Sequence, residues 1–255
     1  MTRHLRRLPD FLVIGVQKGG TSTLFSYLKG HPELVLPQKE IHFFDLYYDR
    51  GLDWYRSHFP MKAGGGATIT GEGTPYYCFH PLVPERIKAD LPAAKLILLL
   101  RNPVDRAHSH YQMIRKQGRI GDQSFEEVLD IEEQTLDRET ERILKDPNHS
   151  SEHHRIYSLL RRGRYYEQIA HWFSLFPREQ FLILRSEDFF QNPKDALGRV
   201  FEFLAIEPVY PDRNLVVNAG TYQPLDETTR TRLSRYFEED QRKLEQLLGP
   251  SFTWR

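Results

Sequence analysis

Residues 11–27 combine an apolar run with glycines, a lysine and hydroxyl side chains, and such a combination can bind an anion. The segment reads FLVIGVQKGGTSTLFSY. Glycines let the backbone come close to a ligand, and the first turn of a helix presents N–H groups at the positive end of its dipole. In an ordinary strand–turn–helix connection, the lysine and the hydroxyl cluster would have no purpose. The spacing therefore predicts an anion-binding loop made of Lys18, Gly19, Gly20, Thr21, Ser22 and Thr23.

This loop differs from the phosphate loop of nucleotide triphosphatases, whose pattern is G-x-x-x-x-G-K-[ST]. The glycine spacing matches, but Thr21 occupies the lysine position and the lysine stands earlier, at Lys18. The apolar run at residues 95–100 ends in Arg101, where a triphosphatase commonly has the aspartate that holds Mg²⁺. These differences favour a second anion contact over a metal site. They make a P-loop kinase or triphosphatase the less favoured enzyme class.

Short apolar runs alternate with helical patterns along the chain. Strands are expected at residues 11–16, 68–71, 95–100 and 181–184. Helices are expected at residues 21–29, 103–118, 124–144, 164–176, 193–204 and 226–248. Pro103 is typical of the first turn of a helix, and Ser124 with Glu127 resembles a capping box. Fully apolar strands separated by helices predict an α/β fold with a central, mostly parallel sheet flanked by helices.

Three segments together resemble a known enzyme family. GVQKGGTSTL, KEIHFFD and LRNPVDRAHSHY are similar to the sulfotransferases that use 3′-phosphoadenosine 5′-phosphosulfate (PAPS). The chain resembles most the domains that act on heparan sulfate and related bacterial proteins. The resemblance continues through GLDWYRSHFP, TPYYCFHPLVPERI, GRYYEQIAHWFSLFP and LLGPSFTWR, so it covers nearly the whole chain. It implies that residues 1–255 form a single sulfotransferase domain with a P-loop-like, three-layer fold.

The resemblance also implies which residues bind the donor. The loop from Lys18 to Thr23 resembles the one that binds the 5′-phosphosulfate of PAPS, and Arg101 with Ser109 resembles the pair that holds the 3′-phosphate. An arginine can offer two parallel hydrogen bonds to a phosphate, and a serine can donate its hydroxyl. The segment NAGTY, with Gly220 and Tyr222, resembles the late loop that closes over the nucleotide, although it lacks the Lys or Arg often found there.

Transfer of a sulfuryl group needs a base for the proton of the acceptor and stabilisation of the leaving phosphate. Lys18 is the candidate for the leaving-group side, without a metal ion. The resemblance to the heparan-type enzymes implies Glu40 as the general base, with His42 in a supporting or substrate-contacting role. In the cytosolic small-molecule sulfotransferases a histidine is the base, so His42 is the alternative. If this segment is extended, Glu40 and His42 share one face and Asp45 lies on the other.

Departures from the family pattern bear on the acceptor. Heparan-modifying members tend to have a lysine directly before a Thr-Pro pair, and here that position is Gly73. The paired cysteines of several such enzymes are absent, since Cys78 is the single cysteine of the chain. Residues 122–146 are rich in acid and are expected to form a solvated helix. These features argue against a polyanionic acceptor and leave a carbohydrate or small-molecule acceptor with a hydroxyl or an amine.

Composition excludes further classes. The 255 residues contain 35 Lys and Arg against 35 Asp and Glu, so the basic excess typical of nucleic-acid binders is missing. Hydrophobic residues at 39% and charged residues at 27% are typical of a folded globular chain. Neither a signal peptide nor a membrane-spanning run is recognisable, so a cytoplasmic protein without a membrane partner is expected. The oligomeric state stays open, and a non-catalytic nucleotide- or glycan-binding module on the same fold is the remaining alternative.

Overall fold

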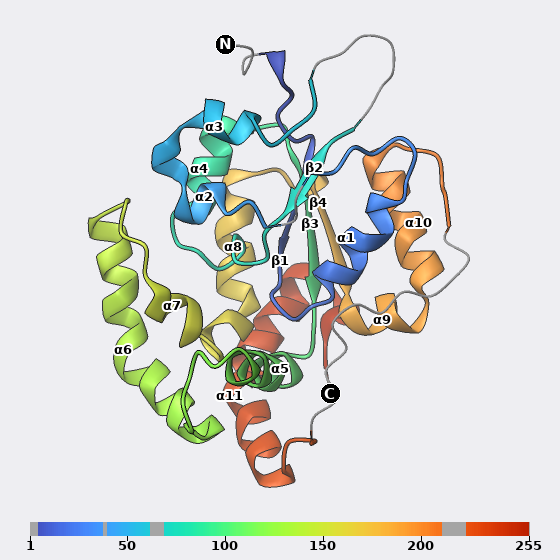
Figure 1. The fold of residues 1–255 in the computed structure, drawn as a ribbon. Helices are drawn as coiled ribbons and strands as arrows, with labels where there is room; N and C mark the ends of the chain where they lie inside the picture. The colour runs from blue at the N-terminus through green and yellow to red at the C-terminus, as the bar shows by residue number, and fades with distance from the viewer. Residues whose placement is uncertain (1–4, 38–39, 62–68, 211–222, 255) are drawn as a thin grey trace. The chain divides into compact units, whose positions relative to one another are not determined.

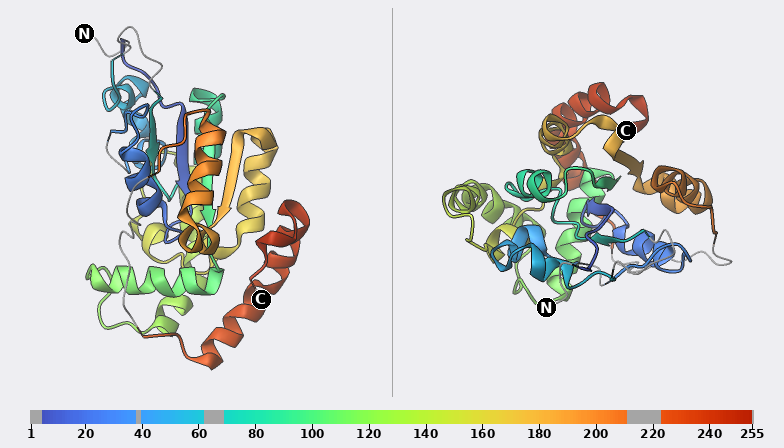
Figure 2. Two further views of the ribbon diagram at one scale, coloured as in Figure 1. Left: turned by 90° about the vertical axis from the view of Figure 1, so that its right-hand side faces the viewer. Right: turned by 90° about the horizontal axis from the view of Figure 1, so that it is seen from above.

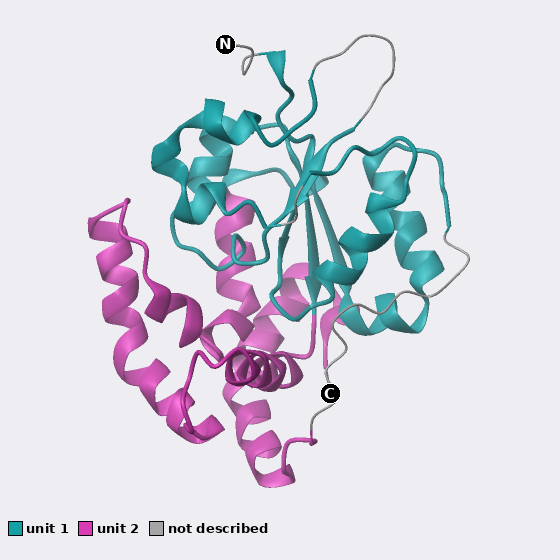
Figure 3. Cartoon of the chain, in the orientation of Figure 1, with its two compact units in different colours: residues 1–100, 175–218 teal, residues 101–174, 219–255 magenta. Residues whose placement is uncertain are grey.

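The computed structural model describes residues 5–37, 40–61, 69–210 and 223–254 (Figure 1). The chain divides into two compact units, each assembled from two stretches of sequence (Figure 3). Residues 1–100 and 175–218 form unit 1, and residues 101–174 and 219–255 form unit 2.

Unit 1 contains a parallel sheet of four strands. The strands are β1 (Phe11–Gly15), β2 (Gly71–Gly73), β3 (Lys95–Leu100) and β4 (Phe181–Arg185). Their order in the sheet is β2-β1-β3-β4, and every pair is parallel. The strand that follows β1 in sequence, β2, lies on one side of β1, and the next strand, β3, lies on its other side. A topological switch point therefore lies between β1 and β3. Ligands of open parallel sheets bind outside the carboxyl ends of the strands at such a point.

Helices cover both faces of this sheet, which confirms the predicted α/β fold with its three layers. On one face lie α1 (Thr21–Lys29), α9 (Ser186–Gln191) and α10 (Pro193–Leu204), as Figures 1 and 2 show. The core on this face is built from alternate strand residues and from apolar residues of these helices, among them Val13, Leu99, Leu184, Leu28 and Phe201. On the other side lie α2 (Phe43–Leu46), α3 (Leu52–Arg56) and α4 (Val83–Asp90) (Figure 1). Short 3₁₀ helices of unit 1 are η2 (Tyr48–Arg50) and η4 (Arg178–Gln180).

The second strand differs from its prediction. It was expected at residues 68–71, but the strand is Gly71–Gly73. Two glycines around a charged Glu72 have low strand propensity, so this stretch does not look like a strand in sequence. The glycine at position 71 is required by close packing, because a Cβ there would lie 2.5 Å from the Phe11 ring on β1. Pairing with Phe11–Val13 of β1 is therefore what makes residues 71–73 a strand.

Unit 2 is helical. Its helices are α5 (Pro103–Lys116), α6 (Phe125–Lys145), α7 (Glu152–Ile156), α8 (Tyr165–Leu175) and α11 (Glu227–Leu248), with 3₁₀ helices η3 (Arg161–Gly163) and η5 (Pro250–Phe252). The helix starts follow local sequence signals. Pro103 opens α5, and the predicted capping box between Ser124 and Glu127 is present at the start of α6. A core containing Val104, Val128 and Phe237 joins α5, α6 and α11.

The acidic helix α6 is not simply a solvated face, so that expectation was wrong in part. Glu132 and Glu139 are buried. Glu132 accepts hydrogen bonds from the backbone N–H groups of Leu160 at 2.8 Å and Arg161 at 2.7 Å. Glu139 accepts one from the Ser151 hydroxyl at 2.8 Å. These carboxylates are satisfied inside unit 2 and hold the segments that follow the helix.

Among the helices in the described part of the chain, none is both long enough and apolar enough to cross a bilayer.

Asp240 on α11 carries a prediction about stability. Burial raises the pKa of its carboxyl to about 6, although the Tyr166 N–H donates to it at 3.4 Å. The folded state therefore binds this proton more tightly than the unfolded state, and stability is lost as pH rises from about 4 through about 6. Asn at this position keeps an acceptor oxygen without the charge. We expect Asp240→Asn to raise the melting temperature at pH 7.5 by about 2–4 °C, corresponding to about 1 kcal/mol after allowance for solvent screening.

The gain should shrink as pH falls below about 6 and vanish only below about 4, which calorimetric scans at pH 7.5 and at about pH 3.5 would show. Glu238→Gln, at an exposed position of the same helix, serves as the control and should show no such pH dependence. An equal gain at both pH values would contradict the assignment of the effect to the Asp240 charge.

Candidate functional site

The loop after β1 is held tightly against the sheet. Lys18 and Gly20 adopt left-handed backbone conformations, with φ of 72° and 96°. A Cβ at Gly19 would lie 2.3 Å from the carbonyl oxygen of Leu99 on β3, so only glycine fits. The Val16 N–H donates to the same Leu99 oxygen at 3.1 Å. These contacts fix the backbone conformation of the loop, which runs along the carboxyl ends of β1 and β3.

The loop leads into the amino end of α1. Gly20 is the N-cap residue and provides no side chain that could cap the helix. The first turn consists of Thr21, Ser22 and Thr23, of which the two threonines are buried. A helix start without a side-chain cap presents its N–H groups and positive dipole end to a ligand. The geometry around Lys18 thus suits an anion.

A second cluster lies at residues 40–45, where the segment is not extended. Glu40 and His42 have positive φ values of 60° and 57°. His42 is the N-cap residue of α2, so the chain enters a helical turn directly after it. The turn brings the Asp45 carboxylate to the His42 ring, with 2.6 Å between Oδ2 and Nδ1. Asp45 therefore lies beside His42 and not on the opposite face.

The exposure of these three side chains to solvent decreases from Glu40 through His42 to Asp45. The exposed fraction is 44% for the Glu40 side chain, 17% for His42 and 0% for Asp45. The Glu40 Oε2 atom lies 3.8 Å from His42 Nε2. The contact of Asp45 is with Nδ1, so Nε2 is the ring atom that faces Glu40. The arrangement therefore places an accessible carboxylate, Glu40, next to the imidazole of His42, which Asp45 orients.

Sequence reasoning did not select Asp45 as a site residue. The available signal is its position three residues after His42, because side chains at this spacing meet where a helix begins.

The segment after β2 anchors this turn. The Glu40 N–H donates to the Gly73 carbonyl at 2.7 Å, and the His42 N–H donates to Thr74 Oγ1 at 3.4 Å. Gly73 in turn pairs with Val13 on β1. Within unit 1, the Glu40–His42 turn and the Lys18 loop are therefore both tied to the carboxyl edge of the sheet.

A buried cation, Arg86 on α4, supports the same turn. Its Nη1 atom donates to the Phe44 carbonyl at 2.5 Å, and its guanidinium lies over the Tyr48 ring at 4.6 Å. Burial lowers the pKa of Arg86, while the nearby charge of Asp45 acts in the opposite direction. Sequence reasoning did not identify Arg86 either, since nothing in the local pattern shows that α4 lies against α2.

The residues predicted to bind the 3′-phosphate belong to unit 2. Arg101 follows β3 in sequence, and its carbonyl accepts a hydrogen bond from the Tyr165 hydroxyl at 2.8 Å. Asn102 caps α5 by accepting from the N–H of Val104 at 3.0 Å. Ser109 lies within α5 and is 5% exposed. Gly220 and Tyr222 lie outside the described residues.

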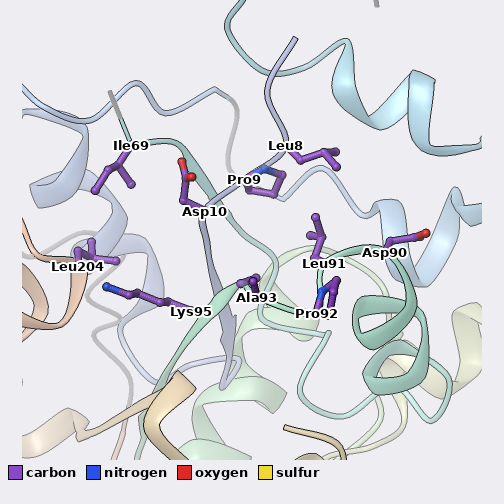
Figure 4. A pocket seen from close by; sticks show the side chains of 11 residues that line it. Leu8, Pro9, Asp10, Ile69, Asp90, Leu91, Pro92, Ala93, Lys95 and Leu204 are labelled. Atoms are coloured by element: carbon purple, nitrogen blue, oxygen red, sulfur yellow. The ribbon is translucent and has the colours of Figure 1, made fainter. Parts of the chain in front are cut away.

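Unit 1 also contains a hollow at the other end of its sheet from the Lys18 loop. It has a volume of about 550 Å³ and is lined by residues that include Pro9, Asp10, Pro92 and Lys95 (Figure 4). Asp10 precedes β1 and Lys95 begins β3, so the hollow lies at the amino ends of the strands, opposite the Lys18 loop. The described residues contain no group of three or more His, Cys, Asp or Glu side chains placed to hold a metal ion.

Comparisons with known proteins identify the family of the chain. A family model described as a sulfotransferase domain matches residues 8–243. Human heparan sulfate glucosamine 3-O-sulfotransferase 6 is 37% identical over 215 residues, which cover 84% of this chain and 57% of that protein. The membrane-associated sulfotransferase Kil1 of Dictyostelium discoideum is 28% identical over 97% of this chain and 66% of its own length. The chain therefore spans less than two thirds of these two relatives.

Among solved structures, a sulfotransferase from Alicyclobacillus acidocaldarius matches with a TM-score of 0.76 and 29% identity. The match covers 95% of this chain and 96% of that one. The sulfotransferase domain from the curacin biosynthetic pathway, at a TM-score of 0.52 and 16% identity, shares the fold.

Proposed function

Since the chain belongs to the sulfotransferase domain family, we propose that it transfers a sulfuryl group from PAPS to a hydroxyl or amine of a carbohydrate or small-molecule acceptor. The observation that carries the proposal is the family match over residues 8–243, which includes both the Lys18 loop and the Glu40–His42 turn. Relatives that are named for transfer to heparan sulfate support a carbohydrate acceptor. The absence of a cationic side chain at Gly73 favours an acceptor with few sulfates.

On the donor side, the Lys18 loop and the amino end of α1 bind the 5′-phosphosulfate. Lys18 and the backbone N–H groups stabilise the negative charge that develops on the leaving phosphate. Arg101 and Ser109 bind the 3′-phosphate, with Gly220 and Tyr222 contributing from the late loop. The close packing of Gly19 against Leu99, which fixes the conformation of the loop, supports the role of the Lys18 loop.

On the acceptor side, Glu40 takes the proton from the acceptor as the new bond to sulfur forms and the bond from sulfur to the leaving phosphate breaks. Adenosine 3′,5′-bisphosphate is released. Glu40 is the most exposed of the three clustered side chains, which suits a group that must meet a substrate. His42 orients Glu40, and Asp45 holds the His42 ring. No step requires a metal ion, because the charge is balanced by Lys18 and N–H groups.

The direct test incubates the full chain with ³⁵S-labelled PAPS and a panel of acceptors in the presence of EDTA. The panel contains desulfated and highly sulfated heparan oligosaccharides, neutral glycans and small alcohols and amines. We expect transfer of label, with desulfated acceptors preferred over highly sulfated ones. Mg²⁺-dependent hydrolysis of ATP without sulfate transfer would instead support a P-loop kinase or triphosphatase. Donor binding without transfer to any acceptor would support a non-catalytic binding module.

Two nucleotides that differ only in the 3′-phosphate test the role of Arg101. Arg101→Ala is expected to weaken binding of adenosine 3′,5′-bisphosphate about 10–100-fold, because a charge-assisted hydrogen bond contributes about 1.5–3 kcal/mol. Binding of adenosine 5′-phosphate, which lacks the 3′-phosphate, should be unchanged. Titration calorimetry measures both. Arg115→Ala, at an exposed position of α5, is the control. An equal loss for both nucleotides would show that Arg101 does not contact the 3′-phosphate.

A further inference from the structure

Glu72 is a fully buried carboxylate close to the Glu40–His42 turn, and it has no role in the chemistry proposed above. It is the central residue of β2 and is 0% exposed. Its side chain accepts hydrogen bonds from the Tyr55 hydroxyl at 3.1 Å and from the Thr74 hydroxyl at 2.9 Å, and the Tyr77 hydroxyl is its third donor. Among the described residues, the contacts of Glu72 are thus with hydroxyls rather than with a cation.

Two of these hydroxyls also contact the turn. Thr74 Oγ1 accepts from the His42 N–H at 3.4 Å. Tyr77 Oη accepts from the N–H groups of Phe43 at 2.9 Å and Phe44 at 3.3 Å. Residues 42–44 are the N-cap and the first turn of α2, whose N–H groups have no partner within the helix. Threonine and tyrosine hydroxyls therefore satisfy the amides on which the orientation of His42 depends.

The role of Glu72 follows from the protons of these hydroxyls. A hydroxyl has one proton to donate and lone pairs to accept with, and it rotates to suit its surroundings. When the proton of Thr74 or Tyr77 points to the Glu72 carboxylate, the lone pairs of the same oxygen face the amides. An acceptor-only group at Glu72 thus sets both hydroxyls in the direction that the turn requires.

Burying a carboxylate at this position costs free energy of desolvation. Burial raises the pKa of Glu72, and the nearby charge of Asp45 adds to the effect, while the hydroxyl hydrogen bonds act against it. Its register partner on β1, Leu12, is equally buried but apolar. The hydrogen bonds to the turn give a reason for a glutamate here that packing alone does not.

We propose that Glu72 is a positioning residue, which acts through the hydroxyls of Thr74 and Tyr77 to hold residues 42–44 and so to orient His42 toward Glu40. The catalytic part of this proposal rests on the proposed function, since the roles of Glu40 and His42 in transfer are themselves proposed.

The chain offers a matched control at Tyr55. The Tyr55 hydroxyl also donates to Glu72, but its contact with the turn is made by the ring, which stacks on Phe43 with 4.4 Å between centroids. Tyr55→Phe keeps this stacking and removes one hydroxyl from Glu72. Tyr77→Phe also removes one hydroxyl, and with it the acceptor for the Phe43 and Phe44 amides.

The first measurement does not depend on activity. Amide hydrogen exchange of the full chain, read at Phe43 and Phe44 by NMR, should be at least about tenfold faster in Tyr77→Phe and in Glu72→Gln than in the wild type. In Tyr55→Phe it should be unchanged. Unchanged exchange in Tyr77→Phe would overturn the proposal whether or not the protein transfers sulfate.

The second measurement is kinetic. In Tyr77→Phe and Glu72→Gln, kcat should fall about 10–100-fold, while KM for PAPS and the Kd for adenosine 3′,5′-bisphosphate stay within about twofold of wild type. Thr74→Val should lose activity in the same way, and Thr74→Ser should retain it. Should Glu72→Gln fail to fold, the Tyr77 and Thr74 variants decide the matter.

The outcomes separate the two proposals. Faster exchange at Phe43 and Phe44 with an undiminished kcat would overturn the positioning role. A wild-type protein that transfers no sulfate, but whose exchange changes as expected, would refute the proposed function and support the Glu72 anchor of the turn.

Discussion

Glu40→Gln is expected to lower kcat about 10²–10⁴-fold, the range that a positioned general base contributes, and to leave the binding of adenosine 3′,5′-bisphosphate unchanged. Glutamine has the shape of glutamate but cannot take the proton of the acceptor. Donor binding should survive because the carboxylate belongs to the 40–45 turn, whereas the donor phosphates are assigned to the Lys18 loop, Arg101 and Ser109. Steady-state transfer of ³⁵S and calorimetry with the bisphosphate provide the two readouts.

Glu202→Gln is the matched control, since Glu202 is an exposed glutamate on α10 of the same unit, and it should behave as wild type. Undiminished turnover in Glu40→Gln would remove Glu40 from the base role. If His42→Asn were then inactive while still binding the bisphosphate, the base would be His42, the alternative that the sequence leaves open.

Gly19→Ala is expected to abolish donor binding and to destabilise unit 1. The added Cβ would lie 2.3 Å from the Leu99 carbonyl oxygen and 3.0 Å from Val16. The loop cannot move away without breaking the hydrogen bond from the Val16 N–H to Leu99, which is 3.1 Å long. Overpacking of this kind costs about 1–3 kcal/mol, and a displaced loop no longer presents Lys18 and the amino end of α1 to a phosphate.

Gly30→Ala is the control at the other end of α1. Its φ of −83° is compatible with any residue, and a Cβ there would meet only the Tyr27 carbonyl oxygen, at 3.6 Å. Thermal unfolding and calorimetry with adenosine 3′,5′-bisphosphate should separate the variants, with Gly19→Ala losing both stability and binding and Gly30→Ala losing neither. Equal behaviour of the two would show that the Lys18 loop tolerates displacement.

Features that depend on neighbouring residues could be predicted from the sequence. The helix at residues 21–29 was predicted with the bounds that α1 has, and the capping box at Ser124 marked the start of α6. Apolar runs predicted β1, β3 and β4, because a strand buried on both faces must be apolar along its length. The glycines and hydroxyl residues around Lys18 likewise predicted a loop followed by a helix start.

The interior of the candidate site could not be predicted in this way. The sequence placed Asp45 opposite Glu40 and His42 only for an extended segment. The left-handed backbone at Glu40 and His42, which ends that extension, has no signal in their residue types. The strand at Gly71–Gly73 was misplaced for a related reason, since its strand conformation comes from pairing with β1 and not from its own propensity.

The sequence by itself thus determined the family, from motifs spread along the chain. It also determined strands β1, β3 and β4 and the loop that carries Lys18, because these depend on residues that are close together along the chain. Only the tertiary structure decided which groups surround the Glu40–His42 turn. Glu72, Tyr55 and Tyr77 meet there because the parallel register of β2 on β1 buries Glu72 and because α3 packs its Tyr55 ring on Phe43. A buried carboxylate must find donors wherever the fold provides them, and here they come from separate segments of the chain.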